Sequence, residues 1–390
     1  MIKSMTSIEL FAYALTVNDH DALHQRTVIR MFGLDAQSRT HVVHVTNFCP
    51  YLYLMLDPSR KWLTPRGTPT GEALALEAYI ERTCSAFAPV KMSFVMKPKL
   101  YGADVVPGSK PPTRVSWPFL FVAFRSASDR TKFTWHFRGK SLYVPGLPRL
   151  WYNVAEEHLN SAQQMTGLGN VKTIGWTRFV VRERDAYVWD AVSWKSIVSL
   201  ERNVYPSPTI ASFDIEVYSS VTGTMCTADR AGDDVFQISL VVQRPDGSID
   251  PILLTISHED GLCVPEPIQW NGSSIPIRVV ACDDEIMLMQ MFSRELVDSG
   301  ANVVIGYNVY GFDWPYIITR ARRVGALPTI DTMAVLCPEE NCNVRETEWS
   351  SAARPDQKIM YIDAPGRVNV DLFSVVKSTY NFGSYKLADV

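Results

Sequence analysis

Hydrophobic and polar positions alternate in several short segments of the chain and recur with helical spacing in others. Residues 49–56 alternate, which predicts a strand, and residues 71–87 have helical spacing after Thr70, a candidate N-cap. We predict further strands at 91–97, 117–124 and 174–181, and a second helix at 150–165. The order β-α-β-β-α-β is typical of a ferredoxin-like fold, a small antiparallel sheet backed by two helices.

The pattern changes after Pro206 and Pro208. Three strands are predicted in turn-rich sequence, then a helix, a buried strand and another helix, an order typical of the ribonuclease-H-like fold. The strands are 209–217, 235–242, 252–256 and 301–307; Asp283 caps the first helix, whose Ile286, Met289, Phe292 and Leu296 share one face, and the last helix is 313–324. We therefore expect domain 1–205, with its ferredoxin-like core at about 49–182, and domain 206–390.

The strand at 49–56 carries Tyr51 and Tyr53 on one face. Aromatic side chains on an open sheet face bind unstacked bases, so this stripe permits a nucleic-acid site. The alternative is that the strand is half-buried and packs against the helix at 71–87.

The strand at 209–217 places two carboxylates on one face. Asp214 and Glu216 are two residues apart, so their side chains point the same way and suit a shared metal ion. Ala211, Phe213 and Ile215 form an apolar frame typical of a buried strand. We expect the carboxylates to be desolvated there and to need cations.

A second acidic position follows about a hundred residues later, in Tyr307-Asn308-Val309-Tyr310-Gly311-Phe312-Asp313. Asn308 ends a predicted strand and Asp313 begins the next helix, so Asp313 lies at the edge of the sheet where ligands gather in α/β folds. Taken singly, Asp313 could be only a helix cap and Asn308 only a turn residue.

The two segments resemble the first two exonuclease motifs of family B (alpha-like) DNA polymerases, F-D-I-E and Y-N-x-x-x-F-D. The residues that follow Asp214 look most like the polymerases of large eukaryotic DNA viruses. Four neighbouring segments also match the family in order and spacing: Asp234 to Ile238, Trp314 to Ile317, Gly366 to Val368 and Ser384 to Leu387.

The resemblance implies proofreading 3′→5′ exonuclease chemistry with two Mg²⁺ or Mn²⁺ ions. Asp214 would bridge the ions, Glu216 would bind the ion that activates water, and Asp313 would anchor the other. Asn308 and Phe312 would hold the terminal nucleotide. The implied partner is DNA, as a single-stranded 3′ end and as a primer–template in a complete polymerase, together with a processivity factor that the sequence does not identify.

The third exonuclease motif of the family is Y-x-x-x-D, and Tyr385 to Asp389 matches it in form. We reject this match, because Ser384 to Leu387 matches a family segment that precedes the third motif. The fourth carboxylate and the palm motifs are therefore expected outside this chain. We expect these 390 residues, the front portion of a longer polypeptide, to have little exonuclease and no polymerase activity by themselves.

Charge is distributed unevenly along the chain, although the net charge is only −3. Residues 91–150 hold eleven Lys and Arg against two acids, a balance of +9, whereas residues 206–390 have a balance of −12. The basic segment permits contacts with a phosphate backbone; the alternative is that its cations only solubilise loops. The candidates are Lys97, Lys99, Arg130 and Lys132.

Seven scattered cysteines indicate no disulfide framework, and no stretch is long and apolar enough to span a membrane. We expect an intracellular protein, in the host nucleus or a viral replication compartment. Two alternatives to an exonuclease stay open: a catalytically silent module that binds single-stranded nucleic acid, and a stand-alone nuclease of the same fold. Retention of Asp214, Glu216 and Asp313 favours the enzyme.

Overall fold

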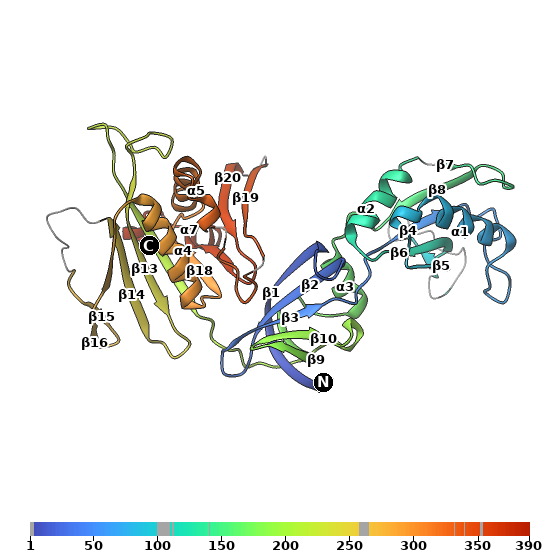
Figure 1. The fold of residues 1–390 in the computed structure, drawn as a ribbon, viewed down its shortest axis with the longest axis horizontal. Coiled ribbons are helices and arrows are strands. Elements are labelled where there is room, and N and C mark those ends of the chain that lie inside the picture. The colour runs from blue at the N-terminus through green and yellow to red at the C-terminus, as the bar shows by residue number, and fades with distance from the viewer. Residues whose placement is uncertain are drawn as a thin grey trace. The chain divides into compact units, whose positions relative to one another are not determined.

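The computed structural model describes residues 4–99, 110, 113–139, 141–256, 265–330, 332–338, 340–351 and 354–390, with strands and helices throughout (Figure 1). Contacts between Cα atoms divide the mixed α/β chain into two compact units. Unit 1 consists of Met1–Glu9, Leu15–Met31 and Val43–Leu200, and unit 2 of Leu10–Ala14, Phe32–Val42 and Glu201–Val390.

The first sheet has the strand order β1-β2-β3-β10-β9-β11, and β1 also pairs with β9. The pairing of β1 with β9 closes five of the strands into a ring. The bounds are β1 (Met5–Asp21), β2 (Arg26–Leu34), β3 (Thr40–Val45), β9 (Gly175–Asp185), β10 (Val188–Ala191) and β11 (Val198–Ser199), with the short helix η2 (Trp194–Ser196) before β11.

The second sheet has the order β5-β6-β4-β8-β7. Its leucine-bearing face packs on two helices: Leu52 and Leu120 share one core with Ile80 of α1 and Phe133 of α2. The bounds are β4 (Tyr51–Leu56), α1 (Gly71–Thr83), η1 (Ser85–Phe87), β5 (Lys91–Pro98), β6 (Ser116–Ala123), α2 (Ala127–His136), β7 (Ser141–Leu142), β8 (Leu150–Ala155) and α3 (Ser161–Gly169).

The predictions for this region were partly wrong. Thr70 caps α1 as expected, accepting a hydrogen bond from the N–H of Ala73 at 3.4 Å. The helix expected at 150–165 is instead strand β8 followed by α3, because a capping box at Asn160 starts the helix only there. The strand expected at 174–181 is β9, which belongs to the first sheet.

The prediction missed α2, the helix that lies between β6 and β8 in the chain. Its buried side chains are only Ala127, Arg130 and Phe133, so the apolar stripe is narrow and contains a cation. That stripe lacks the periodic hydrophobic face by which a helix is recognised.

Unit 2 is built on a six-stranded sheet of order β17-β14-β13-β12-β18-β21. Strand β13 is antiparallel to β12 and β14, whereas β12, β18 and β21 are parallel to one another. The bounds are β12 (Ile210–Val217), β13 (Val235–Gln243), β14 (Ile249–Ile256), β17 (Arg278–Cys282), α4 (Glu285–Ser299), β18 (Val303–Gly306), α5 (Asp313–Val324), β21 (Val368–Asp371) and α7 (Leu372–Thr379).

Helices α4 and α5 pack on one face of this sheet. Phe213 of β12 contacts Phe292 of α4 and Trp314 of α5, with ring centroids 5.1 Å and 5.0 Å apart. Two details of the α4 prediction were wrong. The cap is Asp284, not Asp283, and of the four residues expected on one face only Met289, Phe292 and Leu296 belong to the core, whereas Ile286 is 37% exposed.

Several elements of unit 2 were not predicted. They are β15 (Ile268–Trp270), β16 (Ser273–Ile275), β17, α6 (Leu327–Ile330), β19 (Asn343–Ser351), β20 (Arg354–Asp363), β21 and α7. A short helix, η3 (Leu387–Asp389), follows α7. Strands β19 and β20 form a two-stranded sheet of their own. Among the described residues, none of the helices combines the length and apolar character that crossing a membrane requires.

Gly306, the last residue of β18, lies in close contact with its surroundings. A Cβ atom there would lie 2.1 Å from Cγ1 of Val309 and 2.9 Å from the carbonyl oxygen of Phe213. We predict that Gly306→Ala lowers the free energy of unfolding by about 2 kcal/mol, because the backbone must shift to relieve overpacking. Urea denaturation measures this effect. Gly383→Ala, where a Cβ meets nothing within 4 Å, is the matched control and should be nearly neutral.

Candidate active site

Strand β12 presents Asp214 and Glu216 on the face away from the helices. Ala211, Phe213 and Ile215 are at most 4% exposed, while the two acidic residues between and beyond them are exposed. The alternation was predicted from the sequence. The expected desolvation of this pair is wrong, because their side chains lie on the open face of the sheet.

Asp313 is the first residue of α5 and is only 2% exposed. Strand β18 pairs with β12 only up to Ser212, and the chain turns away after Gly306. The N–H of Ile215 therefore has no strand partner on that side. It donates instead to Oδ1 of Asp313 at 3.2 Å, which fixes this carboxylate at the edge of β12.

The electrostatics of Asp313 depend on burial and on Asp214. Burial and the neighbouring negative charge of Asp214 raise the pKa of Asp313 to about 7, against the lowering effect of the hydrogen bond from Ile215. The carboxylates of Asp214 and Asp313 are close enough to interact. Such a pair is stable only if one carboxylate is protonated or if a cation lies between them. Hard oxygen ligands of this kind fit Mg²⁺.

The structure thus brings Asp214 and Asp313 together. Glu216 lies two residues further along the same face of β12. In the part of the chain that the structure describes, no group of three or more His, Cys, Asp or Glu side chains is close enough to hold a metal ion. The donor set that fits a cation here is the Asp214–Asp313 pair.

The turn between β18 and α5 is shaped by Asn308 and Asp371. Asn308 has a φ of +63°, in the left-handed region. Its N–H and that of Tyr310 donate to the carboxylate of Asp371 at 2.8 Å and 3.1 Å. A Cβ atom on Gly311 would lie 2.6 Å from Oδ1 of Asn308, so the Asn308 side chain folds back over the turn.

Phe312 precedes Asp313 as the N-cap residue of α5 and makes no side-chain capping hydrogen bond. Its half-buried ring lies 5.6 Å from that of Tyr316, centroid to centroid. The ring therefore packs along the first turn of α5, next to Asp313 in the chain.

The four basic candidates of unit 1 do not converge. Lys97 lies 4.0 Å above the ring of Tyr53 and Lys99 lies 3.3 Å above that of Trp117, on the aromatic side of the second sheet. Arg130 and Lys132 belong to α2, which packs on the leucine side. Arg130 is 8% exposed and donates to the carbonyl oxygen of Leu159, so its role is structural.

The tyrosine stripe of β4 lies on the face opposite α1. Tyr51 and Tyr53 are buried, at 4% and 8% exposure, and the leucines between them pack on the helix. The strand therefore packs against α1 through its leucines, not through its tyrosines.

Tyr385 and Asp389, which match the third motif in form, lie in the exposed segment after α7. The hydroxyl of Tyr385 donates to the carbonyl oxygen of Tyr380 at 2.9 Å, and Tyr307 donates to the carbonyl oxygen of Tyr385. Asp389 ends the short helix η3 and is exposed.

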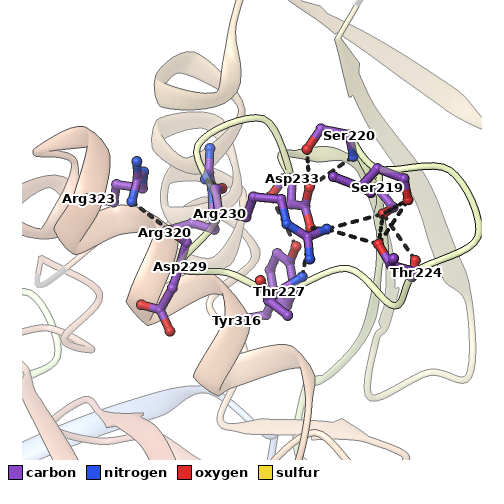
Figure 2. Close-up of polar contacts among 11 residues, drawn as sticks. Ser219, Ser220, Thr224, Thr227, Asp229, Arg230, Asp233, Tyr316, Arg320 and Arg323 are labelled. Carbon is purple, nitrogen blue, oxygen red and sulfur yellow. Dashed lines mark hydrogen bonds and ion pairs between the residues drawn. The ribbon is translucent and has the colours of Figure 1, made fainter.

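The prediction missed a polar network around Arg320, whose contact with the segment after β12 is shown in Figure 2. Arg320 is 2% exposed and donates to both carboxylate oxygens of Glu285, at 2.8 Å and 2.6 Å, and to Asp234. Glu285 also accepts from the N–H of Val235 at 2.9 Å. Position 320 follows Asp313 by two helical turns and so lies on the same buried face of α5. A charged residue on that face was the signal in the sequence that could have revealed the network.

We predict that Asp313 makes the stability of the protein depend on pH. Its pKa is about 7 in the folded state and 3.8 ordinarily, so between these values the folded state binds more protons and stability falls as pH rises. The slope contributed by one such group is at most about 1.4 kcal/mol per pH unit. Urea denaturation at pH 5 and pH 8, with and without Mg²⁺, measures the effect.

Asp313→Asn is the control for this prediction. The difference in stability between wild type and the variant should change with pH in the absence of divalent cations and should flatten when Mg²⁺ is added. A wild-type protein whose pH dependence equals that of the variant would contradict the assignment of a raised pKa to Asp313.

The chain is similar in sequence to known DNA polymerases. Residues 180–390 match the family model for the exonuclease domain of DNA polymerase family B. The chain is 26% identical over 403 residues to DNA polymerase 120R of Invertebrate iridescent virus 3, covering 97% of this chain and 33% of that protein. It is 27% identical over 367 residues to the putative DNA polymerase 060R of Frog virus 3 (isolate Goorha), covering 92% and 32%.

A solved structure shows the same fold. The family B DNA polymerase of the hyperthermophilic archaeon Pyrobaculum calidifontis matches with a TM-score of 0.59 and 19% identity, over 95% of this chain and 38% of that one. The chain spans about a third of the length of the viral relatives it matches. An exonuclease domain of this family implies a ribonuclease-H-like fold, which agrees with the strand order of unit 2.

Proposed function

The chain belongs to DNA polymerase family B, and we propose that residues 206–390 contribute a 3′→5′ exonuclease site that hydrolyses the last phosphodiester bond of an unpaired strand. The observation that carries this proposal is Asp313. It is a buried carboxylate with a pKa of about 7 that faces Asp214 at the edge of β12. Such a pair is stable in its ionised form only with a cation between the carboxylates.

In this proposal Asp214, Glu216 and Asp313 would hold the metal ions. Bound Mg²⁺ or Mn²⁺ would stabilise the developing charge and lower the pKa of the attacking water. The hydrogen bond from Ile215 holds Asp313 in its orientation, while Asp214 and Glu216 face the solvent side from which a strand enters. Asn308 and Phe312 would contact the terminal nucleotide.

We further propose that the segment from β4 to β8 is ferredoxin-like. Its strands pair in the order second, third, first, fourth, with two crossover helices on one face. In this assignment the core ends with β8 and the domains are 1–205 and 206–390. The complete polypeptide would be a DNA-directed DNA polymerase that also binds primer–template DNA.

The second candidate function is a silent module that binds single strands. The observation that favours it is that no group of three potential metal ligands forms within the described part of the chain. The two functions differ in whether divalent cations bind at Asp214 and Glu216.

We predict that the chain binds Mn²⁺ in isothermal titration and that Asp214→Ala with Glu216→Ala abolishes this binding. The same double variant should reduce any Mg²⁺-dependent release of 3′ nucleotides from labelled single-stranded DNA by on the order of a thousandfold or more, because charge stabilisation is lost where the transition state needs it. Asp298→Asn, a change at a carboxylate that is 63% exposed, is the matched control and should leave both unchanged. Mn²⁺ binding that survives the double substitution would support the silent module instead.

We also predict that Lys97 and Lys99 contact phosphates and that Lys132 does not. Replacing both Lys97 and Lys99 by Ala should weaken binding of a single strand and make the log–log salt slope less negative by about 1.4, since each lost phosphate contact contributes about 0.7. Lys132→Ala, next to Asp129 at 3.7 Å on the other side of the sheet, should leave the slope unchanged. Fluorescence anisotropy at several salt concentrations measures the slope. Equal effects of all three lysines would contradict the prediction and indicate that the lysines act only through their contribution to the net charge.

A further inference from the structure

A cavity of about 520 Å³ lies on the second sheet of unit 1, where strand β4 ends. Strand β4 runs between β6 and β8 in that sheet (Figure 1). The lining of the cavity includes Met55, Asp57, Trp117, Trp151 and Asn153, from these three strands and the turn after β4. The volume is within the range of about 300–1,000 Å³ that is usual for small-molecule sites.

The strand register places the two tryptophans at the same level, one on each side of β4. Met55 pairs with Phe119 of β6 and with Asn153 of β8. Trp117 and Trp151 each precede one of these partners by two residues, so both side chains lie on the same face of the sheet as Met55.

The spacing of the strands gives the width of the slot between the two indoles. Neighbouring strands lie about 4.8 Å apart, so the backbones of Trp117 and Trp151, two strands apart, are separated by roughly 10 Å. One flat ring fits between the two indoles, because carbon atoms in contact lie about 3.5–4.0 Å apart.

Each of the two tryptophans has a cation over its ring. Nζ of Lys99 lies 3.3 Å from the ring centroid of Trp117, and Cζ of Arg149 lies 5.5 Å from that of Trp151. Nε of Arg149 donates to the hydroxyl of Ser141 at 2.9 Å, which holds the arginine in place. Trp151 is 56% exposed. Two aromatic rings that flank one cavity, each with a cation beside it, indicate a ligand with a flat ring and a negative charge.

Asp57 supplies a fixed hydrogen-bond acceptor in the cavity. Its Oδ1 accepts from the hydroxyl and the N–H of Ser59, at 2.7 Å and 2.9 Å. These bonds lower the pKa of Asp57, so the carboxylate is ionised at neutral pH. Its Oδ2 accepts no hydrogen bond from the part of the chain that the structure describes. An ionised carboxylate can only accept hydrogen bonds, which favours a ligand that donates one.

We propose that this cavity binds one nucleotide whose base carries an exocyclic amino group, with the base between Trp117 and Trp151 and the amino group donating to Asp57. The phosphate of the nucleotide would contact Lys99 or Arg149. The site lies in unit 1 and is independent of the proposed exonuclease function.

The two parts of the cavity have different effects on binding. Bases stack on aromatic rings irrespective of their identity, so the tryptophans contribute affinity without preference. The carboxylate contributes the preference, because cytosine has an amino group at position 4 where uracil has a carbonyl oxygen. That carbonyl oxygen cannot donate to Asp57 and is repelled by its negative charge.

The test uses deoxycytidine and deoxyuridine monophosphates, dCMP and dUMP, whose bases differ only at position 4. Binding to the 390-residue chain is measured by quenching of tryptophan fluorescence. We expect dCMP to bind about tenfold more tightly or more, because dUMP lacks a hydrogen bond to a charged group. Equal affinities would overturn the proposal.

Substitution of the tryptophans tests stacking. Trp117→Ala and Trp151→Ala should each weaken dCMP binding by about tenfold. Trp135→Ala is the matched control, at a tryptophan that is 57% exposed and has Arg138 over its ring but lies outside this cavity, and it should have no effect. Urea denaturation shows whether the variants fold. If Trp117→Ala does not, the exposed Trp151 decides the result, and unchanged affinity in Trp151→Ala would overturn the proposal.

Two further variants test the contacts of the base edge and of the phosphate. Asp57→Asn should bind dCMP and dUMP equally, because an amide can donate as well as accept. Replacing both Lys99 and Arg149 by Ala should reduce the affinity for dCMP to that for deoxycytidine, which has no phosphate. A preference for dCMP that persists in Asp57→Asn would contradict the role of the carboxylate and overturn the proposal.

A free nucleotide and a nucleotide within a single strand share this chemistry, and an oligonucleotide distinguishes them. A deoxyuridine pentanucleotide with cytosine at its centre is compared with the all-uracil pentanucleotide and with dCMP. Tighter binding of the cytosine-containing strand than of dCMP identifies a strand as the ligand, and the reverse order identifies a free nucleotide. Tryptophan-lined grooves also bind proline-rich peptides. Quenching by such a peptide but by no nucleotide, or no binding of any of these probes, would overturn the proposal.

Discussion

The buried carboxylate of Asp313 is the constraint on which the site of unit 2 depends. It is held where β12 extends beyond its shorter neighbour β18, because the N–H of Ile215 has no partner in β18 and donates to this carboxylate instead. A longer β18 would fill that position with a backbone carbonyl and leave no room for the carboxylate. The turn between β18 and α5, which donates two hydrogen bonds to Asp371, then places the first residue of α5 at the same edge of β12.

Two buried arginines, Arg367 and Arg320, bind near the two ends of helix α4. Arg367 is 7% exposed and donates to the carbonyl oxygens of Leu296, Ala301 and Met333, which satisfies groups near the end of α4 that the helix itself leaves open. Burial lowers the pKa of Arg367 to about 10, so it stays charged at neutral pH. At the beginning of α4, Arg320 donates to the side-chain carboxylate of Glu285 and so joins α5 to that end of the helix. Removing one partner of such a pair costs about 3–5 kcal/mol, because the other charge remains buried.

The sequence predicted those parts of unit 2 in which apolar residues recur with the period of a strand or of a helix. The alternation around Asp214 and the helix from Asp313 to Val324 are as expected, because an apolar face is sufficient to specify them. Helix α2 was missed because Arg130 occupies its buried stripe, and the helix expected at 150–165 failed because a cap at Asn160 separates a strand from a helix within one apolar stretch. Contacts of polar residues across long sequence separations, such as Arg320 with Glu285, leave no periodic trace.

One stripe of helix α5 connects the carboxylate of Asp313 to segment 218–234, which joins β12 to β13. Asp313, Tyr316, Arg320 and Arg323 follow one another at spacings of three, four and three residues, so they lie on one face of the helix. The first places its carboxylate beside Asp214, and the other three donate hydrogen bonds to backbone carbonyl oxygens of segment 218–234. A rotation of α5 about its axis would therefore move the carboxylate and this segment together. Phe213 of the sheet packs against Trp314 of α5, and this contact prevents the rotation and so fixes both parts with one interface.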